Sequence, residues 1–164
     1  MTDNEKIARL VVNKALAPDP FTEDALALRF SERHKNDLRY IAIRGQWLKW
    51  DGQRCRPEPT HLAFDLARRS CRLDAEAYGN GKPAAGVYSK KTAAAVEFMA
   101  KADRRHATTI EEWDADPYLL SAAGTTIDLR TGLDWPSDPA SYITKTTACT
   151  VAPPGRAPNL DKVS

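Results

Sequence analysis

The sequence has few of the features that mark secreted or membrane proteins. Its three cysteines are widely spaced and form no CxxC pair, which argues against a disulfide scaffold. No apolar run approaches the roughly 20 residues that cross a bilayer. Acidic residues stand near the N-terminus, where a secretory signal would be basic. We therefore expect a cytoplasmic protein of 164 residues that makes no membrane contact.

Motifs for nucleotide, metal and covalent chemistry are also missing. The phosphate-binding pattern GxxxxGK[ST] does not occur, and residues 79–82 lack the Ser or Thr that would follow the lysine. Cys55, His61 and Cys71 match no structural zinc spacing, and Cys71 is better explained as a small core residue. No motif pairs Cys149 with a histidine as a nucleophile. We predict no enzymatic activity, no cofactor and no metal.

Charge is nearly balanced overall but unevenly distributed. The chain has 24 basic and 22 acidic residues, for a net charge of +2. Residues 1–30 carry a net charge of −1, residues 31–110 of +7 and residues 111–164 of −4. A basic middle segment of this kind could meet a polyanion, whereas its flanks would not.

Helical periodicity and capping residues predict five helices along the chain. We expect helices over residues 3–16, 22–36, 60–78 and 88–106, and a short one that begins at Thr109 and ends before Pro117. Thr22 and Thr60 are the expected N-caps, and Thr109 with Glu112 forms a capping-box pattern. The expected buried face of the third helix is Ala63, Leu66, Ala67, Cys71, Ala75 and Tyr78; that of the fourth is Thr92, Ala95, Phe98, Met99 and Ala102.

Two segments have the character of β-structure. Residues 38–56 contain β-branched and aromatic runs broken by Gly45 and by Asp51-Gly52, which predicts an antiparallel meander of strands 38–43, 46–50 and 53–56. Asp51-Gly52 is typical of a two-residue type I′ turn. After Pro117 the turn-rich sequence predicts short strands.

Together these elements predict an α+β fold. We expect a mainly helical domain with a small antiparallel meander near the N-terminus and short strands near the C-terminus, which pack back on two central antiparallel helices. The expected boundaries are an N-terminal helix or arm over residues 1–20, the domain over 21–152 and a flexible proline-rich linker over 153–164.

Basic side chains concentrate on the two central helices. The candidate DNA-binding residues are Arg68, Arg69 and Arg72 on the first helix, Lys90, Lys91, Arg104 and Arg105 on the second, and Arg44, Lys49 and Trp47 on the meander. The ordinary alternative is a solvated helix face with the tryptophan in the core. For the acids between 111 and 116, helix capping and a solvated turn are favoured over a cation site.

Two separated motifs resemble one known domain. DLRY at 37–40 with WLKWDGQR at 47–54 resembles the opening of the helicase-associated N-terminal domain in phage, plasmid and poxvirus primase-helicases. WDADPYLL at 113–120, IDLRTG at 127–132 and YITK at 142–145 resemble its end. The sequence departs from the pattern at Cys55, where relatives have an aromatic residue, and at Ala123-Gly124, where they have Asn-Gly. The resemblance covers residues 21–152.

The resemblance implies a replication module. In that family the domain joins a primase to a superfamily 3 helicase motor, whose ATPase motifs this chain lacks, so we interpret it as an excised domain or a truncated mobile-element gene. We expect a non-catalytic module that engages single-stranded or forked DNA, or positions the motor. The alternatives are a protein-interaction or homo-oligomerisation module, and a stand-alone mobile-element regulator or host-directed inhibitor.

Overall fold

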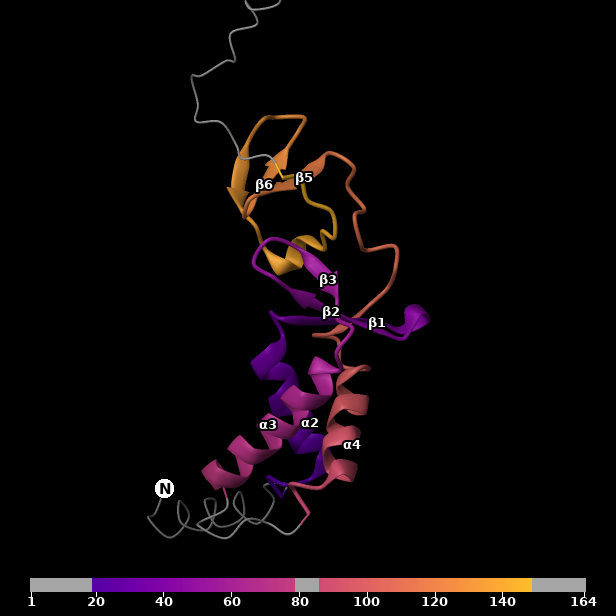
Figure 1. Ribbon diagram of the computed structural model, residues 1–164, viewed down its shortest axis with the longest axis vertical. Coiled ribbons are helices and arrows are strands. Elements are labelled where there is room, and N and C mark those ends of the chain that lie inside the picture. Colours follow the sequence, from indigo (N-terminus) through magenta and orange to yellow (C-terminus); the bar gives the residue numbers. More distant parts are fainter. Residues whose placement is uncertain (1–18, 79–85, 149–164) are drawn as a thin grey trace, which may run out of the picture. The chain divides into compact units, whose positions relative to one another are not determined.

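The computed structural model describes residues 19–78 and 86–148, and within them the α+β class is confirmed (Figure 1). These residues form two compact units. The helical unit comprises residues 19–35, 59–78 and 86–107, and the β unit comprises residues 36–58 and 108–148. The helix expected at residues 3–16 and the linker expected at residues 153–164 lie outside the described residues.

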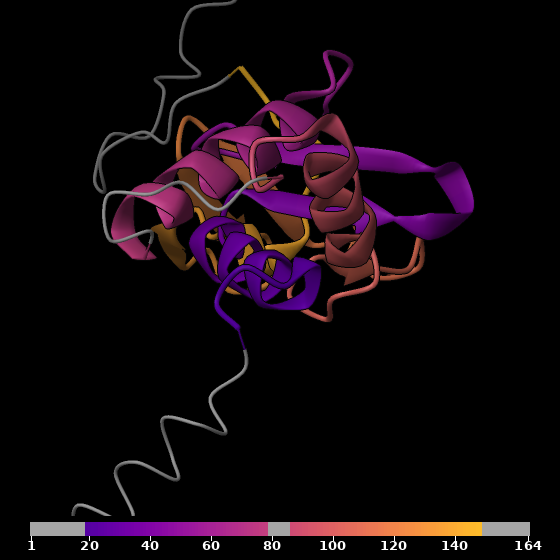
Figure 2. The same ribbon diagram turned by 90° about the horizontal axis from the view of Figure 1, so that it is seen from below.

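Three helices build the helical unit: α2 (Glu23–His34), α3 (Leu62–Tyr78) and α4 (Lys90–Ala100). They lie side by side, and α3 runs antiparallel to the other two (Figures 1 and 2). The predicted cap of α2 is confirmed, because the Thr22 hydroxyl accepts a hydrogen bond from the Ala25 amide at 3.2 Å. α3 begins two residues after the predicted cap Thr60, and the His61 carbonyl accepts the amides of its first turn.

The buried face of α3 agrees with the prediction for Ala63, Ala67, Cys71 and Ala75. Leu66 is half-buried, and the side chain of Tyr78 lies outside the described set. These small side chains allow neighbouring helices to approach closely.

The predicted buried face of α4 was wrong. Ala93, Val96 and Ala100 are buried, whereas Phe98 is 72% exposed and Met99 is 39% exposed. Of the other expected members, Thr92 and Ala95 are half-buried and Ala102 is exposed. Small residues face the neighbouring helices, so the large side chains point outward. The helix also ends at Ala100 rather than near His106, because the chain continues as turns in which Asp103 accepts the Arg105 amide at 2.9 Å.

A buried ion cluster joins α2 to α3. Asp74 is fully buried, and its carboxylate accepts hydrogen bonds from Arg29 Nε at 2.9 Å and from the guanidinium of Arg33. A buried carboxylate that lacked these cations would be strongly unfavourable. The cluster therefore holds α2 and α3 in one register.

The first sheet has the order β3-β2-β1-β4, formed by β1 (Leu38–Ile41), β2 (Gln46–Trp50), β3 (Cys55–Pro57) and β4 (Ala107–Thr108). The predicted antiparallel pairing of the first three strands is confirmed. β1 ends earlier than expected because residues 42–44 form a 3₁₀ turn, which Gly45 closes with a left-handed φ of 60°. Ile41, Leu48, Cys55 and Trp113 form the core beside this sheet.

The predicted two-residue turn at Asp51-Gly52 was wrong. Trp50 pairs with Cys55, so the connection has four residues, and of them Gly52 has the positive φ, at 97°. The Asp51 carboxylate accepts the amides of Gln53 and Arg54, each at 3.0 Å. These side-chain bonds satisfy donors that a tighter turn would use, so they stabilise the wider loop.

The second sheet has the order β5-β6-β7 and confirms the prediction of short strands after Pro117. Its strands are β5 (Leu119–Ala122), β6 (Thr125–Asp128) and β7 (Asp134–Pro136). The expected helix after Thr109 is absent from the described residues and a turn replaces it, although the Thr109 amide does donate to the Glu112 carboxylate at 2.6 Å.

The β-rich segment belongs to the same unit as the meander. The Cys55 amide donates to the Ile143 carbonyl at 2.9 Å, and the Ser121 hydroxyl donates to the Gln53 carbonyl at 3.1 Å. No described helix is both long enough and apolar enough to cross a membrane.

The β5–β6 turn predicts a stabilising substitution. Ala123 and Gly124 connect β5 to β6 with φ values of 47° and 88°, a conformation that disfavours alanine and suits asparagine. We expect A123N to raise the free energy of unfolding by about 0.5–1 kcal/mol. Urea unfolding measures it, with A140N as the control, since Ala140 is exposed and is not a positive-φ residue. Equal effects at both positions would contradict the explanation.

Candidate nucleic-acid interface

Two predicted cations of α3 line a hollow at the start of α4, and two more belong to the first turn of that helix. Arg68 and Arg72, one turn apart on α3, line a hollow of about 40 Å³ together with Tyr88 and Ser89. Lys90 and Lys91 follow Ser89 directly in the first turn of α4, and both are exposed. We call Arg68, Arg72, Lys90 and Lys91 the α3–α4 basic cluster.

The sequence contained a local signal for this site that the prediction missed. Ser89 is the N-cap of α4, and its hydroxyl accepts the Thr92 amide at 3.0 Å. Serine directly before an apolar periodic run is a common helix start. The cap fixes the start of α4 directly before the two lysines, which therefore stand in its first turn.

The cations of the cluster differ in how far they are neutralised. Arg69, the third predicted cation of α3, binds Asp65 at 2.6 Å, and Arg68 approaches the same carboxylate at 3.5 Å. These are exposed pairs and contribute little energy. Arg72 makes no ion pair within the described residues. Its guanidinium is therefore the most available charge on this face of α3.

The predicted cations at the far end of α4 form a different arrangement. Arg104 is exposed, but Arg105 binds Asp103 at 2.7 Å and Glu32 at 3.1 Å. The side-chain hydrogen bond from Arg105 lowers the pKa of Asp103 from 3.8 to about 2. Since its charge is already balanced by two carboxylates, Arg105 contributes less to a free positive surface than the cluster does.

The candidate residues on the meander lie in the β unit. Arg44 and Lys49 are exposed, whereas Trp47 is only 8% exposed and packs against Tyr40 with ring centroids 5.0 Å apart. Trp50 packs against the core beside the first sheet. Burial of the Trp47 ring favours a structural role over base stacking, since stacking requires an accessible ring face.

The buried cysteines, which the sequence left as candidates for metal or thiol chemistry, have structural roles. Cys55 and Cys71 are buried in separate units, and burial raises the pKa of the Cys55 thiol to about 11. Among the described residues, no group of three or more ligating side chains could hold a metal ion.

By its fold and candidate site, the protein is a small α+β protein with a basic cluster on two of its helices. The chain belongs to the D5 N terminal like family, which matches residues 27–163 and is the N-terminal region of D5-like primase-helicases. The resemblance read from the two sequence motifs is thereby confirmed. No curated protein and no solved structure matches the chain.

The Asp103–Arg105 pair predicts an acid dependence. Because the folded pKa of Asp103 is about 2 and its ordinary value is 3.8, its stabilising contribution is present above about pH 4 and lost as the pH falls towards 2. We expect D103N to remove this part of the pH dependence of unfolding, measured by urea titration at several pH values. D134N, at an exposed position on β7, is the control. An unchanged acid dependence in D103N would contradict the assignment.

Proposed function

We propose that this chain is a non-catalytic replication module that engages single-stranded or forked DNA through the α3–α4 basic cluster. The observation that supports the proposal is the convergence of Arg68 and Arg72 with the first turn of α4 on one small polar hollow. Arginine guanidinium groups recognise phosphate with paired donors, and lysines add charge. Family membership supplies the replication context.

Such a site would bind the nucleic-acid backbone rather than its bases. The hollow is small, about 40 Å³, and Tyr88 and Ser89 line it beside the two arginines, so it offers charged donors but no space for a base. Backbone contacts of this type give affinity that does not depend on sequence and that falls steeply with salt. Since Trp47 is buried, we do not include base stacking by its ring in the proposed mode.

The cellular setting follows from the same proposal. The module would act in the cytoplasm of a host cell as part of a phage or plasmid replication protein, where it would hold DNA beside the helicase motor. DNA engagement and motor positioning are compatible, because a non-specific backbone contact can keep a strand near a neighbouring ring.

The basic cluster predicts a specific loss of DNA binding. We expect R68A/R72A to weaken binding of a fluorescein-labelled single-stranded oligonucleotide about tenfold at low salt. The slope of log affinity against log salt should fall in magnitude by about 1.5, because two phosphate contacts are lost. Fluorescence anisotropy over a salt series measures both quantities.

The matched control is R104A/K145A, which removes the same charge from exposed positions outside the cluster. It should change affinity by less than about threefold. Equal losses in the two double variants, or no binding by the wild-type chain at low salt, would overturn the proposal. The urea midpoints of both variants should match the wild type, since all four side chains are largely exposed.

A second candidate function, protein interaction or self-association, has an observation of its own. Phe98 is 72% exposed on α4 and Met99 beside it is 39% exposed. Aromatic and methionine side chains are enriched at the centres of protein interfaces. Exposed side chains of this size suit contact with another subunit or with the motor.

The exposed face of α4 predicts the outcome of a light-scattering experiment. If the chain self-associates through Phe98, F98S should raise the dissociation constant about tenfold or more while leaving folding intact. L28S, at a position that is 49% exposed on α2, is the control. A wild-type chain that stays monomeric at every concentration would reject self-association.

A further inference from the structure

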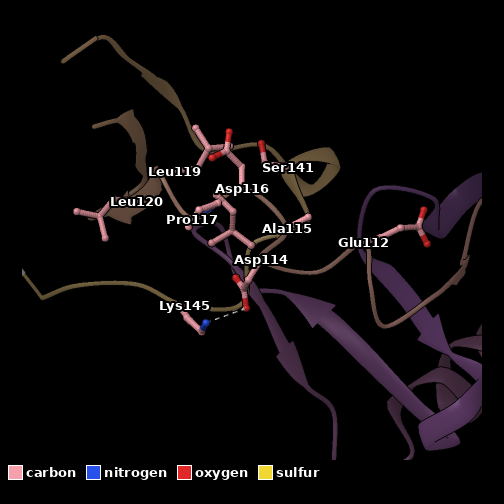
Figure 3. Close-up of a pocket in the computed structure, with 10 residues that line it drawn as sticks. Glu112, Asp114, Ala115, Asp116, Pro117, Leu119, Leu120, Ser141 and Lys145 are labelled. Carbon is pink, nitrogen blue, oxygen red and sulfur yellow. Dashed lines mark ion pairs between the residues drawn. The ribbon is translucent and has the colours of Figure 1, made fainter. Parts of the chain in front are cut away.

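The β unit contains a hollow of about 400 Å³ to which the proposed DNA contact gives no role. Figure 3 shows Asp114, Asp116, Leu119 and Ser141 around Pro117, with Leu120 at one end of the view and Glu112 at the other. Its volume lies within the range of about 300–1,000 Å³ that is typical of binding sites.

The floor of this hollow is apolar and lies at a sheet edge. Pro117, Leu119, Leu120 and Ile143 contribute to its lining, and the first three retain exposed surface. β5 is the edge strand of its sheet, and its bridge to Thr147 is made at Ala122, the last residue of the strand. Leu119 and Leu120 therefore line the hollow from the other end of an edge strand, where an extended segment can lie alongside.

The rim of the hollow is acidic, and local bonds orient its carboxylates. Asp114 accepts the Thr144 amide at 2.9 Å. Asp116 accepts the Tyr118 amide at 3.0 Å and pairs at 2.8 Å with Arg130, whose side chain is 50% exposed, so this pair is weak and a second cation can compete for the carboxylate. These contacts fix where the carboxylates stand along the hollow.

The field around the hollow is negative. The described residues of the β unit, 36–58 and 108–148, contain ten acidic and seven basic side chains, and the carboxylates of Glu112, Asp114 and Asp116 line the hollow itself. Lys145 stands 3.9 Å from the Asp114 carboxylate, but its side chain is 84% exposed, so an incoming cation can replace it at little cost. The same field repels phosphate, so nucleic acid does not fit this surface.

We propose that this hollow docks an extended segment of a partner protein in which apolar side chains alternate with lysine or arginine. The apolar side chains fill the space over Pro117, Leu119 and Ile143, and the cations meet Asp114 and Asp116. Alternation suits an extended peptide, because its successive side chains point to opposite sides. The inference is independent of DNA binding by the α3–α4 basic cluster.

The probe is a fluorescein-labelled peptide of alternating leucine and lysine, capped at both ends, added to the full chain. We expect saturable binding that moves backbone amide signals at Leu119, Leu120 and Ser141 in NMR spectra, while signals of α4 stay in place. A peptide with glutamate for lysine should not bind. Shifts confined to the helical unit, or spread evenly over the molecule, would overturn the proposal without the need for any variant.

Matched variants test how much the carboxylate charges contribute to peptide affinity. D114N/D116N removes two charges but keeps side-chain oxygens that can accept the amides of Thr144 and Tyr118, and it should weaken the lysine peptide about fivefold or more. E111Q/D134N removes the same charge from exposed positions of the β unit that do not line the hollow, and it should have less than about twofold effect. Equal effects of the two pairs would reduce the binding to general attraction and overturn the proposal.

One further comparison tests whether the hollow is occupied by a partner protein or by the N-terminal segment of this chain. Residues 6–14 read KIARLVVNK, which is basic and apolar like the proposed ligand. If a chain that lacks residues 1–18 bound the probe about tenfold more tightly than the full chain, its own N-terminal segment would be the occupant and the partner assignment would be wrong. Equal affinity of the two chains supports an external partner.

Discussion

The buried carboxylate of Asp74 is the constraint that fixes how α2 and α3 pack in the helical unit. It is fully buried and receives two arginines from α2, so α2 and α3 cannot slide past each other without leaving a charge uncompensated. Arg72 lies two residues earlier, which at 100° per residue puts it on the opposite side of α3. Burial of Asp74 therefore turns Arg72 outward, towards the hollow at the start of α4.

The basic and acidic segments of the sequence form different elements of the structure. The +7 segment supplies α3, α4 and the meander, whereas the acidic segment supplies the second sheet and the hollow beside it. A phosphate backbone and a basic peptide need opposite fields. The α3–α4 basic cluster and the acidic rim of the hollow lie in different units, so the two proposed surfaces have opposite sign and neither proposed ligand competes for the site of the other.

Local chemistry made several features predictable. Thr22 followed by two acids marks the start of α2, and the alternating residues of the meander mark its strands, because both signals act within a few residues. The Asp51-Gly52 turn and the helix after Thr109 were mispredicted for a local reason too. At Asp51 the carboxylate bonds to two nearby backbone amides and stabilises a wider loop, whereas at Thr109 the expected bond from the amide to Glu112 forms but closes only a turn.

By itself, the sequence determined the α+β class, the family, the small-residue face of α3 and the presence of a basic middle segment. Tertiary structure decided which face of α4 is buried, because burial there depends on close approach to neighbouring helices and not on hydrophobicity alone; Phe98 is consequently outside and Ala93 inside. It also decided which basic segments come together. Arg72 and Lys90 are 18 residues apart in sequence, and the antiparallel packing of α3 and α4 brings their segments to one hollow.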